Sequence, residues 1–372
     1  MNLVKNKLIT CIAMIILSIA IIIIASNITL SKGCISNTGS TLYKDGFFFD
    51  TYISITLYNV SPYNESVLNE CINMCEKYEK IFSRTNTTSE LYIINQHISN
   101  NPNKAIQISD DMFQCIKNTL RFSASFGKHY SILSGNLCDI WDYEQKIIPN
   151  NDDIKQHLAS IGAHNIKLND ASTSLIIAYN QKDNTSEDLE DLDNIHKYIV
   201  PAIDLGASAK GYIADKLCTY LKEQGITDAI IDLGGNIVVI GDKPDDSMYK
   251  IGIKKPFSDT NEISAICKIA DVSLVTSGIY QRYFVENDTI FHHIIDCSTG
   301  YPTDNDILSV TIISKNALQA DCFSTGCLLL GKEDTLSLIN STKEVECVII
   351  DSDYSIHLSD GLTYDKDFIV LK

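Results

Sequence analysis

The sequence has too few basic residues to balance its acidic ones. Its 30 lysines and arginines stand against 47 aspartates and glutamates, which gives a formal net charge of −17. Because no basic stripe offsets this charge, we exclude nucleic acid as the partner. The two common nucleotide-phosphate fingerprints, G-x-G-x-x-G and G-x-x-x-x-G-K-[ST], are also absent, so neither a dinucleotide-binding motif nor a P-loop is predicted.

The chain has 12 cysteines but no C-x-x-C spacing. This absence disfavours a paired-cysteine metal site and a disulfide-rich scaffold. Cys71 and Cys75 lie four residues apart in a helical pattern, which indicates core packing more often than a metal pair. We therefore expect several free thiols.

The first residues have the pattern of an export signal. Lys5 and Lys7 precede an apolar run over residues 8–25, which is long enough to cross a bilayer. Residues 1–34 are predicted to be either an uncleaved signal anchor or a lipoprotein signal peptide in which Cys34 becomes lipidated. Either arrangement places the protein at the cell membrane, on its extracytoplasmic face. We expect a linker over 35–46 and a folded domain over 47–372.

The rest of the chain predicts an α+β, or mixed α/β, fold. Apolar strand patterns and helical patterns alternate without a clean βαβ period, so mixed or antiparallel sheets flanked by helices are favoured over a Rossmann fold.

A turn of small residues near the middle of the chain is suited to an anion. An apolar strand ends at Asp204, and the sequence then runs through Gly206 and Ala207 to Lys210, just before a helix predicted to start near Tyr212. Such a turn brings backbone N–H groups close to a phosphate, and the lysine adds a positive charge.

Two oxygen-bearing side chains lie four residues apart in a later predicted helix. Asp321 and Thr325 therefore point from the same helix face. Hard oxygens are the ligands that Mg²⁺ prefers. A capping or solvent-facing pair is the alternative for these two residues taken alone.

A histidine pair is followed by a carboxylate in the segment from His292 to Asp296. Histidine is suited to general-base catalysis because it titrates near neutral pH. Neighbouring residues of a strand face opposite ways, so only one of the two histidines can enter a site. An ordinary surface pair is the alternative.

Trp141, the only tryptophan, could stack on a planar ring, but a core position is the commoner role.

Taken together and in order, these segments resemble the ApbE family of flavin transferases. The matching segments extend from about Phe47 to Asp351 and are Ser83-Arg84 with Asn95, Gly135 to Trp141, Asp204 to Tyr212, Gly234-Gly235-Asn236, Thr276-Ser277-Gly278, His293 to Asp296, and Asp321 with Thr325.

The resemblance implies a two-lobed fold with FAD in a cleft. It also implies a reaction: FMN passes from FAD to a threonine hydroxyl of a target protein, with Mg²⁺ as cofactor and AMP as the released product. His293 would be the base, supported by Asp296. Ala207, through its carbonyl, Asp321 and Thr325 would hold Mg²⁺. The residues implied to bind FAD are Asp204, Lys210, Ile295, Ile140, Trp141 and Asp142.

Two other functions stay open at this stage. An FAD pyrophosphatase would use water in place of threonine and release FMN and AMP, and a flavin-binding lipoprotein would do no chemistry. The resemblance also suggests the acceptor: a flavoprotein that carries a threonine-containing target motif, either a subunit of an Rnf- or Nqr-type complex or an extracellular flavoprotein.

Overall fold

The computed structural model describes residues 40–179, 200–243, 247–260 and 262–371. The predicted anchor over 1–34 and Cys34 lie outside these residues. Within the described ranges, no helix is both long and apolar enough to span a bilayer.

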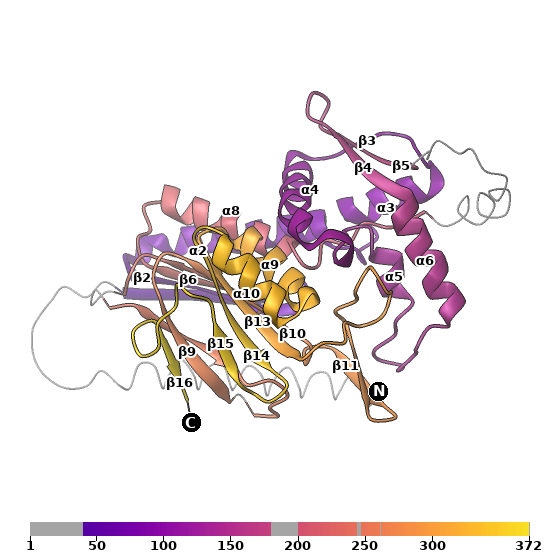
Figure 1. Cartoon of the computed structure of the whole chain (residues 1–372). Helices are drawn as coiled ribbons and strands as arrows, with labels where there is room; N and C mark the ends of the chain where they lie inside the picture. Colours follow the sequence, from indigo (N-terminus) through magenta and orange to yellow (C-terminus); the bar gives the residue numbers. More distant parts are fainter. Residues whose placement is uncertain (1–39, 180–199, 244–246, 261, 372) are drawn as a thin grey trace, which may run out of the picture. The chain divides into compact units, whose positions relative to one another are not determined.

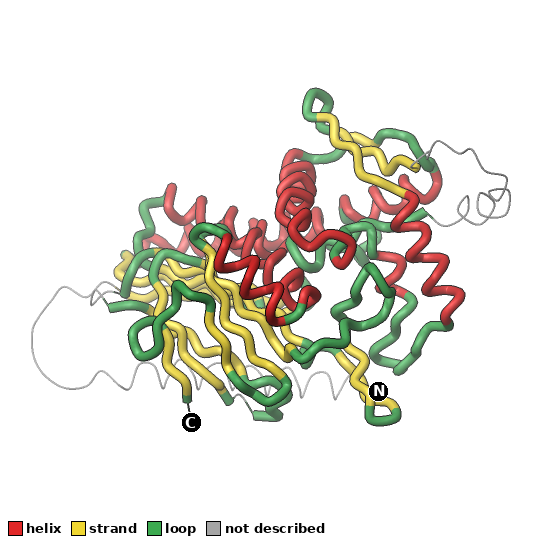
Figure 2. The backbone as a smooth tube through the Cα atoms, in the orientation of Figure 1, coloured by secondary structure: helices red, strands yellow, loops and turns green. Residues whose placement is uncertain are grey.

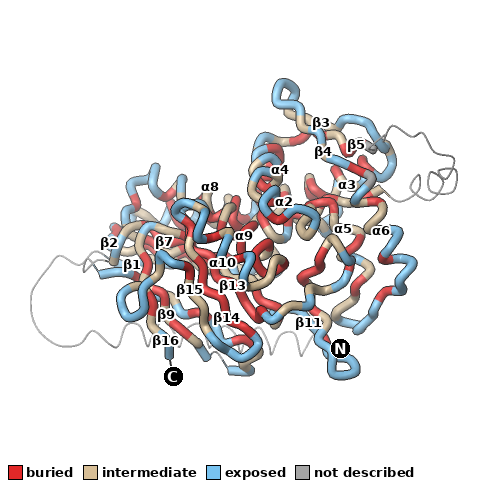
Figure 3. The backbone as a smooth tube through the Cα atoms, viewed as in Figure 1, coloured by how far each residue is buried: buried red, intermediate tan, exposed pale blue. Residues whose placement is uncertain are grey.

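The centre of the fold is an antiparallel sheet of eight strands (Figure 1). In spatial order its strands are β1 (Ser40–Phe48), β2 (Thr51–Val60), β6 (Ala229–Leu233), β7 (Asn236–Ile240), β10 (Ser273–Gly278), β13 (Ile307–Ser314), β14 (Val345–Asp351) and β15 (Ile356–Leu358). Every residue of β13 is buried, as Figure 3 shows for this part of the sheet. A strand that is covered on both faces has an apolar run in place of alternation.

Helices cover one face of this sheet. The main core joins strand residues such as Ile55 and Val310 to helix residues such as Leu217 and Phe323. The helices of the described chain are α2 (Glu65–Phe82), α3 (Glu90–Asn100), α4 (Asp110–Ser123), α5 (Gly135–Asp139), α6 (Asn151–Ala163), α8 (Ala209–Glu223), α9 (Ala317–Leu330) and α10 (Lys332–Ser341), with 3₁₀ turns η1 (Pro62–Asn64) and η2 (Ala124–His129). Their arrangement against the strands is visible in Figure 2.

A three-stranded sheet covers part of the other face. A second core joins Val239 and Ile350 of the large sheet to Tyr249 and Phe368 of the small one. The strands of the small sheet are, in spatial order, β16 (Phe368–Val370), β9 (Ile263–Ile269) and β8 (Tyr249–Lys254). The remaining strands are β3 (Ile106–Gln107), β5 (Ser174–Tyr179) and β4 (His164–Asn169), which form one sheet, and the hairpin of β11 (Tyr283–Glu286) and β12 (Thr289–His292).

The folded unit begins earlier than predicted. Residues 40–46, which we expected to be a linker, belong to β1, which pairs with β2 in antiparallel register. The compact unit starts at Gly39. The segment is polar and half-exposed, so it lacks the apolar alternation of a buried strand. Its structure comes from pairing with β2 at the edge of the sheet.

The cysteine prediction is confirmed for the described residues. Cys71 and Cys75 are both fully buried in the main core. All ten cysteines of the described ranges are free thiols, and burial raises the pKa of the Cys71 and Cys75 thiols to about 12. These thiols therefore pack as small apolar groups and have little reactivity.

Candidate active site

The candidate site is built where helices α8 and α9 cross. A carboxylate of each helix accepts hydrogen bonds from N–H groups in the first turn of the other helix. Asp321 of α9 accepts from the N–H of Gly211 at 2.8 Å. Asp215 of α8 accepts from the N–H groups of Ala317 and Leu318 at 2.8 and 3.0 Å. The exposed N–H groups of a first turn carry partial positive charge. Asp321 therefore lies at the positive end of α8.

The start of α8 differs from the prediction. The helix begins at Ala209, so Lys210 lies in its first turn and not in the turn before a helix at Tyr212. The glycine at position 211 suggests a helix break, but here it permits close contact between the two helices. The Lys210 ammonium is exposed and donates to the Gly206 carbonyl at 3.4 Å.

Gly211 is required by the helix crossing. A Cβ atom at this position would lie 2.7 Å from both the Asp321 Cβ and the Leu318 Cα, and it would also overlap the Ala317 carbonyl oxygen. These neighbours are mostly backbone atoms that cannot rotate away. The close approach of α8 and α9, and with it the position of Asp321, depends on this glycine.

We expect Gly211→Ala to destabilise the protein by about 1–3 kcal/mol, the range for inserting a methyl group into a closely packed contact. Urea unfolding monitored by circular dichroism measures this change. Gly162→Ala in α6 is the matched control, because a Cβ atom there meets nothing within 4 Å and alanine is the better helix former. Equal stability of Gly211→Ala and Gly162→Ala would contradict the tight crossing.

Asp321 is a buried carboxylate, with 4% of its surface exposed. Burial raises its pKa, and only the nearby Lys210 charge and the Gly211 N–H act against that shift. A buried carboxylate that lacks a close cation is costly unless a ligand compensates it. This residue therefore has the environment of a group that binds a cation.

Thr325 and Ala207 supply further oxygens near this point. The Thr325 hydroxyl lies 3.0 Å from the Ser277 hydroxyl of β10, which also contacts Ser324 at 2.8 Å. The Ala207 carbonyl accepts a hydrogen bond from the Tyr130 hydroxyl at 3.5 Å. A carboxylate, a hydroxyl and a carbonyl form an oxygen donor set that suits Mg²⁺. Within the described ranges, no cluster of three or more His, Cys, Asp or Glu side chains offers another metal site.

The two adjacent histidines have different environments. His292 is 3% exposed, and its Nε2 lies 3.0 Å from the Thr303 carbonyl, so it is a structural residue. The Nδ1 atom of His293 is buried and has no hydrogen-bond partner among the residues that the structure describes. Burial, with the charges of His292 and Arg282, lowers the pKa of His293 to about 4. His293 is therefore a neutral imidazole at physiological pH.

Asp296 contacts a different histidine from the one expected. Its Oδ2 lies 3.0 Å from the Nδ1 of His129, and its Oδ1 accepts the Ser298 N–H at 2.7 Å. No contact between Asp296 and His293 is found in the described part of the chain. Asp296 therefore orders the turn after the histidine pair. His129 had no local sequence signal, since it follows a helix 167 residues away from its partner.

The residues expected to line a flavin form two groups. The first, Asp204 and Lys210, belongs to the turn before α8 and to the first turn of that helix. The second contains Trp141, Ile140, Asp142 and Ile295. Asp204 is partly exposed, and its Oδ1 accepts the Gly206 N–H at 2.7 Å. Trp141 is 4% exposed, stacks on Phe291 and packs in a cluster with Ile295. Its ring is therefore a core group.

The other residues of the second group contribute through their backbone or through turns. The Asp142 carboxylate accepts the N–H groups of Glu144 and Gln145 at 3.0 and 2.8 Å. Ile295 is buried and pairs with Pro302 in an isolated bridge. Ile140 is half-buried beside the Trp141 cluster. The N–H and carbonyl of Asp142 also pair with Ile147, so this residue holds the local structure through both its side chain and its backbone.

Comparison with known protein families identifies residues 49–349 as a match to the ApbE family. The chain belongs to the ApbE family. It is 28% identical over 305 residues to the FAD:protein FMN transferase of Klebsiella pneumoniae, with 82% of this chain and 88% of the relative covered. It is 25% identical over 338 residues to the enzyme of the same name from Treponema pallidum, covering 84% and 85%.

Solved ApbE structures have the same fold. The ApbE protein of Thermotoga maritima matches with a TM-score of 0.73 at 24% identity, covering 86% of this chain and 97% of that one. The flavin transferase ApbE of Vibrio cholerae matches with a TM-score of 0.69 at 22% identity, again covering 86% and 97%. The predictions of an ApbE-family transferase and of a mixed α/β fold are confirmed.

Proposed function

We propose that this protein is a Mg²⁺-dependent FAD:protein FMN transferase, which moves FMN from FAD to a threonine hydroxyl of an acceptor protein and releases AMP. The observation that carries the proposal is the buried Asp321 carboxylate at the N-terminus of α8, next to Lys210 and the oxygens of Ala207 and Thr325. Family membership supplies the reaction class.

The proposed chemistry assigns a role to each part of the site. A threonine hydroxyl is a weak nucleophile and needs a positioned base. His293, neutral at physiological pH, takes the hydroxyl proton as the oxygen attacks the FMN phosphorus. The phosphorus–oxygen bond to AMP then breaks. Lys210 and the N-terminus of α8 stabilise the negative charge on the phosphates.

The metal fits the residues that are present. Asp321, Thr325 and the Ala207 carbonyl would hold Mg²⁺, which supplies charge neutralisation for the pyrophosphate when bound. The buried Asp321 carboxylate, which forms no ion pair among the described residues, is the structural reason for this assignment.

The location and partner are also part of the proposal. An N-terminal anchor or a lipid on Cys34 would hold the enzyme at the extracytoplasmic face of the membrane. There it would meet an acceptor flavoprotein with a threonine-containing motif, of the Rnf or Nqr type or an extracellular flavoprotein.

A transfer assay tests the proposal. The full-length protein in detergent is incubated with FAD, Mg²⁺ and an acceptor that carries the threonine motif, and flavin-labelled acceptor and AMP are measured together. We expect one AMP for each FMN bound covalently, and no product with EDTA. AMP release at the same rate without acceptor would indicate a pyrophosphatase. FAD binding without either product would indicate a non-catalytic flavin-binding protein.

A further inference from the structure

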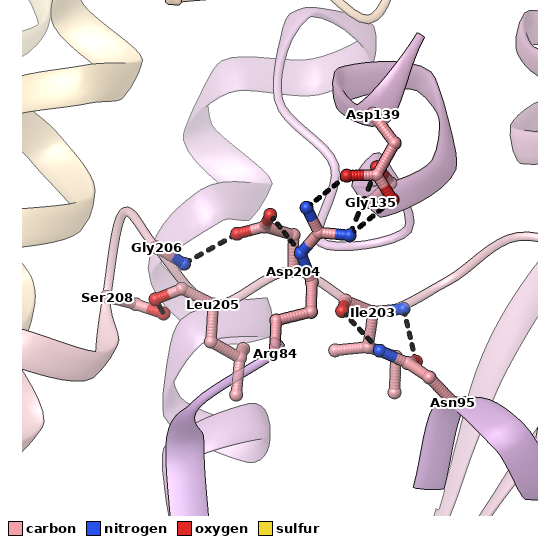
Figure 4. Close-up of polar contacts among 9 residues, drawn as sticks. All are labelled: Arg84, Asn95, Gly135, Asp139, Ile203, Asp204, Leu205, Gly206 and Ser208. Carbon is pink, nitrogen blue, oxygen red and sulfur yellow. Dashed lines mark hydrogen bonds and ion pairs between the residues drawn. The ribbon is translucent and has the colours of Figure 1, made fainter. Parts of the chain in front are cut away.

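Arg84 is an unassigned cation that lies between two carboxylates. It follows α2, and its guanidinium contacts both Asp139 oxygens at 2.5 and 2.6 Å, while its Nε lies 3.1 Å from the Asp204 Oδ2 (Figure 4). Two parallel N–H···O contacts to one carboxylate fix the guanidinium in its plane, which a lysine cannot do.

The two carboxylates belong to separate segments of the candidate flavin site. Asp139 is the last residue of α5, directly before the segment Ile140–Asp142. Asp204 begins the turn that leads to Ala207 and Lys210. Arg84 thus connects both segments, although they are far apart in the sequence.

The turn that carries Asp204 has no regular secondary structure of its own. It is held by contacts from other elements: Asn95 of α3 donates to the Ile203 carbonyl at 2.9 Å and accepts the Ile203 N–H at 2.8 Å, and the Asp204 N–H donates to the Ile132 carbonyl at 2.8 Å. These contacts fix the backbone of the turn. Of the described residues, only Arg84 forms an ion pair with the Asp204 carboxylate.

The Asp204 carboxylate is therefore constrained from both sides. Oδ1 accepts the Gly206 N–H and Oδ2 faces the Arg84 Nε, so both oxygens have defined partners (Figure 4). Its side chain is 25% exposed, which leaves it accessible to a ligand. Without Arg84, the carboxylate would lose one of these constraints, and α5 would lose its link to the turn.

We propose that Arg84 is a positioning residue for FAD binding, which holds Asp204 and the Ile140–Asp142 segment at a fixed separation through its contacts with Asp204 and Asp139. The inference rests on the proposed function and on the FAD-binding role that the family resemblance implies for these two segments. The guanidinium need not touch the flavin itself.

The test is a double-mutant cycle read out as the Kd for FAD, measured by fluorescence titration of the full-length protein. We expect Arg84→Gln and Arg84→Lys each to weaken FAD binding by about 10-fold or more. Glutamine removes the charge, and lysine keeps the charge but cannot form the two parallel N–H···O contacts of the guanidinium. In an Asp204→Asn background, Arg84→Gln should add less than about twofold, since coupled residues are not additive. Lys222→Gln, which breaks the exposed pair with Asp271, is the control with unchanged affinity.

Asp139→Asn covers the case in which the Arg84 variants fail to fold. It leaves the contact between Arg84 and Asp204 in place and weakens only the attachment to α5, so we expect a loss of FAD affinity of about threefold or more. Wild-type affinity in Arg84→Lys or Asp139→Asn would overturn the inference, as would an Arg84→Gln effect that is fully additive with Asp204→Asn. Failure of the wild-type protein to bind FAD would instead count against the proposed function.

Discussion

Asp321→Asn is expected to lower the rate of flavin transfer by about 1,000-fold. The substitution keeps an oxygen that can accept the Gly211 N–H but removes the negative charge that would hold Mg²⁺. A metal ion contributes several kcal/mol to a phosphoryl-transfer transition state, and about 4 kcal/mol corresponds to a factor of about 1,000. The measurement is the rate of acceptor flavinylation at saturating FAD over a range of Mg²⁺ concentrations.

The same substitution is expected to stabilise the metal-free protein. Asp321 is buried and forms no ion pair among the described residues, and a buried charge without such a partner destabilises the fold. An amide of nearly the same shape has no such penalty. Thermal unfolding in EDTA should therefore give a higher Tm for Asp321→Asn than for the wild type, although its activity is lost.

Two substitutions of Thr325 test the metal site without changing the charge of Asp321. Thr325→Ser keeps the hydroxyl that contacts Ser277 and should retain most of the activity, whereas Thr325→Val should raise the Mg²⁺ concentration needed for half-maximal rate. Activity of Asp321→Asn above a tenth of the wild-type rate at saturating Mg²⁺ would contradict the assignment of the metal site. So would identical Mg²⁺ dependence of the two Thr325 variants.

The sequence predicted the parts of the site that have a local signal. Asp321 and Thr325 share helix α9, and this pattern lies within a few residues. The prediction for Asp321 and Thr325 depends on short-range geometry, which periodicity describes well. The strand predicted to end at Asp204 is wrong, because residues 200–205 have no regular secondary structure and their backbone is held by contacts from other segments. His292 ends β12 and His293 follows the strand in a bend, so strand alternation does not account for their differing environments.

The contacts between distant segments could not be predicted in this way. Arg84 reaches Asp139 across 55 residues and Asp296 reaches His129 across 167. The resemblance includes Ser83-Arg84 among its matching segments, but no local pattern indicates which carboxylates Arg84 contacts. Trp141 is a similar case, because its core position depends on contacts with the distant residues Phe291 and Ile295.

The pH dependence of transfer tests whether His293 is the base. Because burial lowers the pKa of His293 to about 4, the base is already neutral at pH 5.5. We expect kcat/KM, which reports the ionisation of the free enzyme, to fall only as the pH approaches 4. His293→Gln should lower the transfer rate by about 100- to 10,000-fold while leaving FAD binding intact.

Stability provides a second readout of the same ionisation. The pKa of His293 is lower in the folded chain than the value of about 6.5 expected in the unfolded chain. The unfolded chain therefore binds the extra proton first, and this histidine contributes stability above pH 6.5 that is lost as the pH falls towards 4. Urea unfolding of the wild type and of His293→Gln should show a difference that grows in favour of the variant over this interval.

A fall of kcat/KM that begins well above pH 4 would contradict His293 as the base. The candidate would then be His129, whose Nδ1 is held by the buried Asp296 carboxylate and whose ring is one-third exposed. A carboxylate at one ring nitrogen leaves the other nitrogen oriented for proton transfer, as in hydrolase triads. In that case His129→Gln would abolish transfer and His293→Gln would not. The two variants, assayed side by side, decide which imidazole accepts the threonine proton.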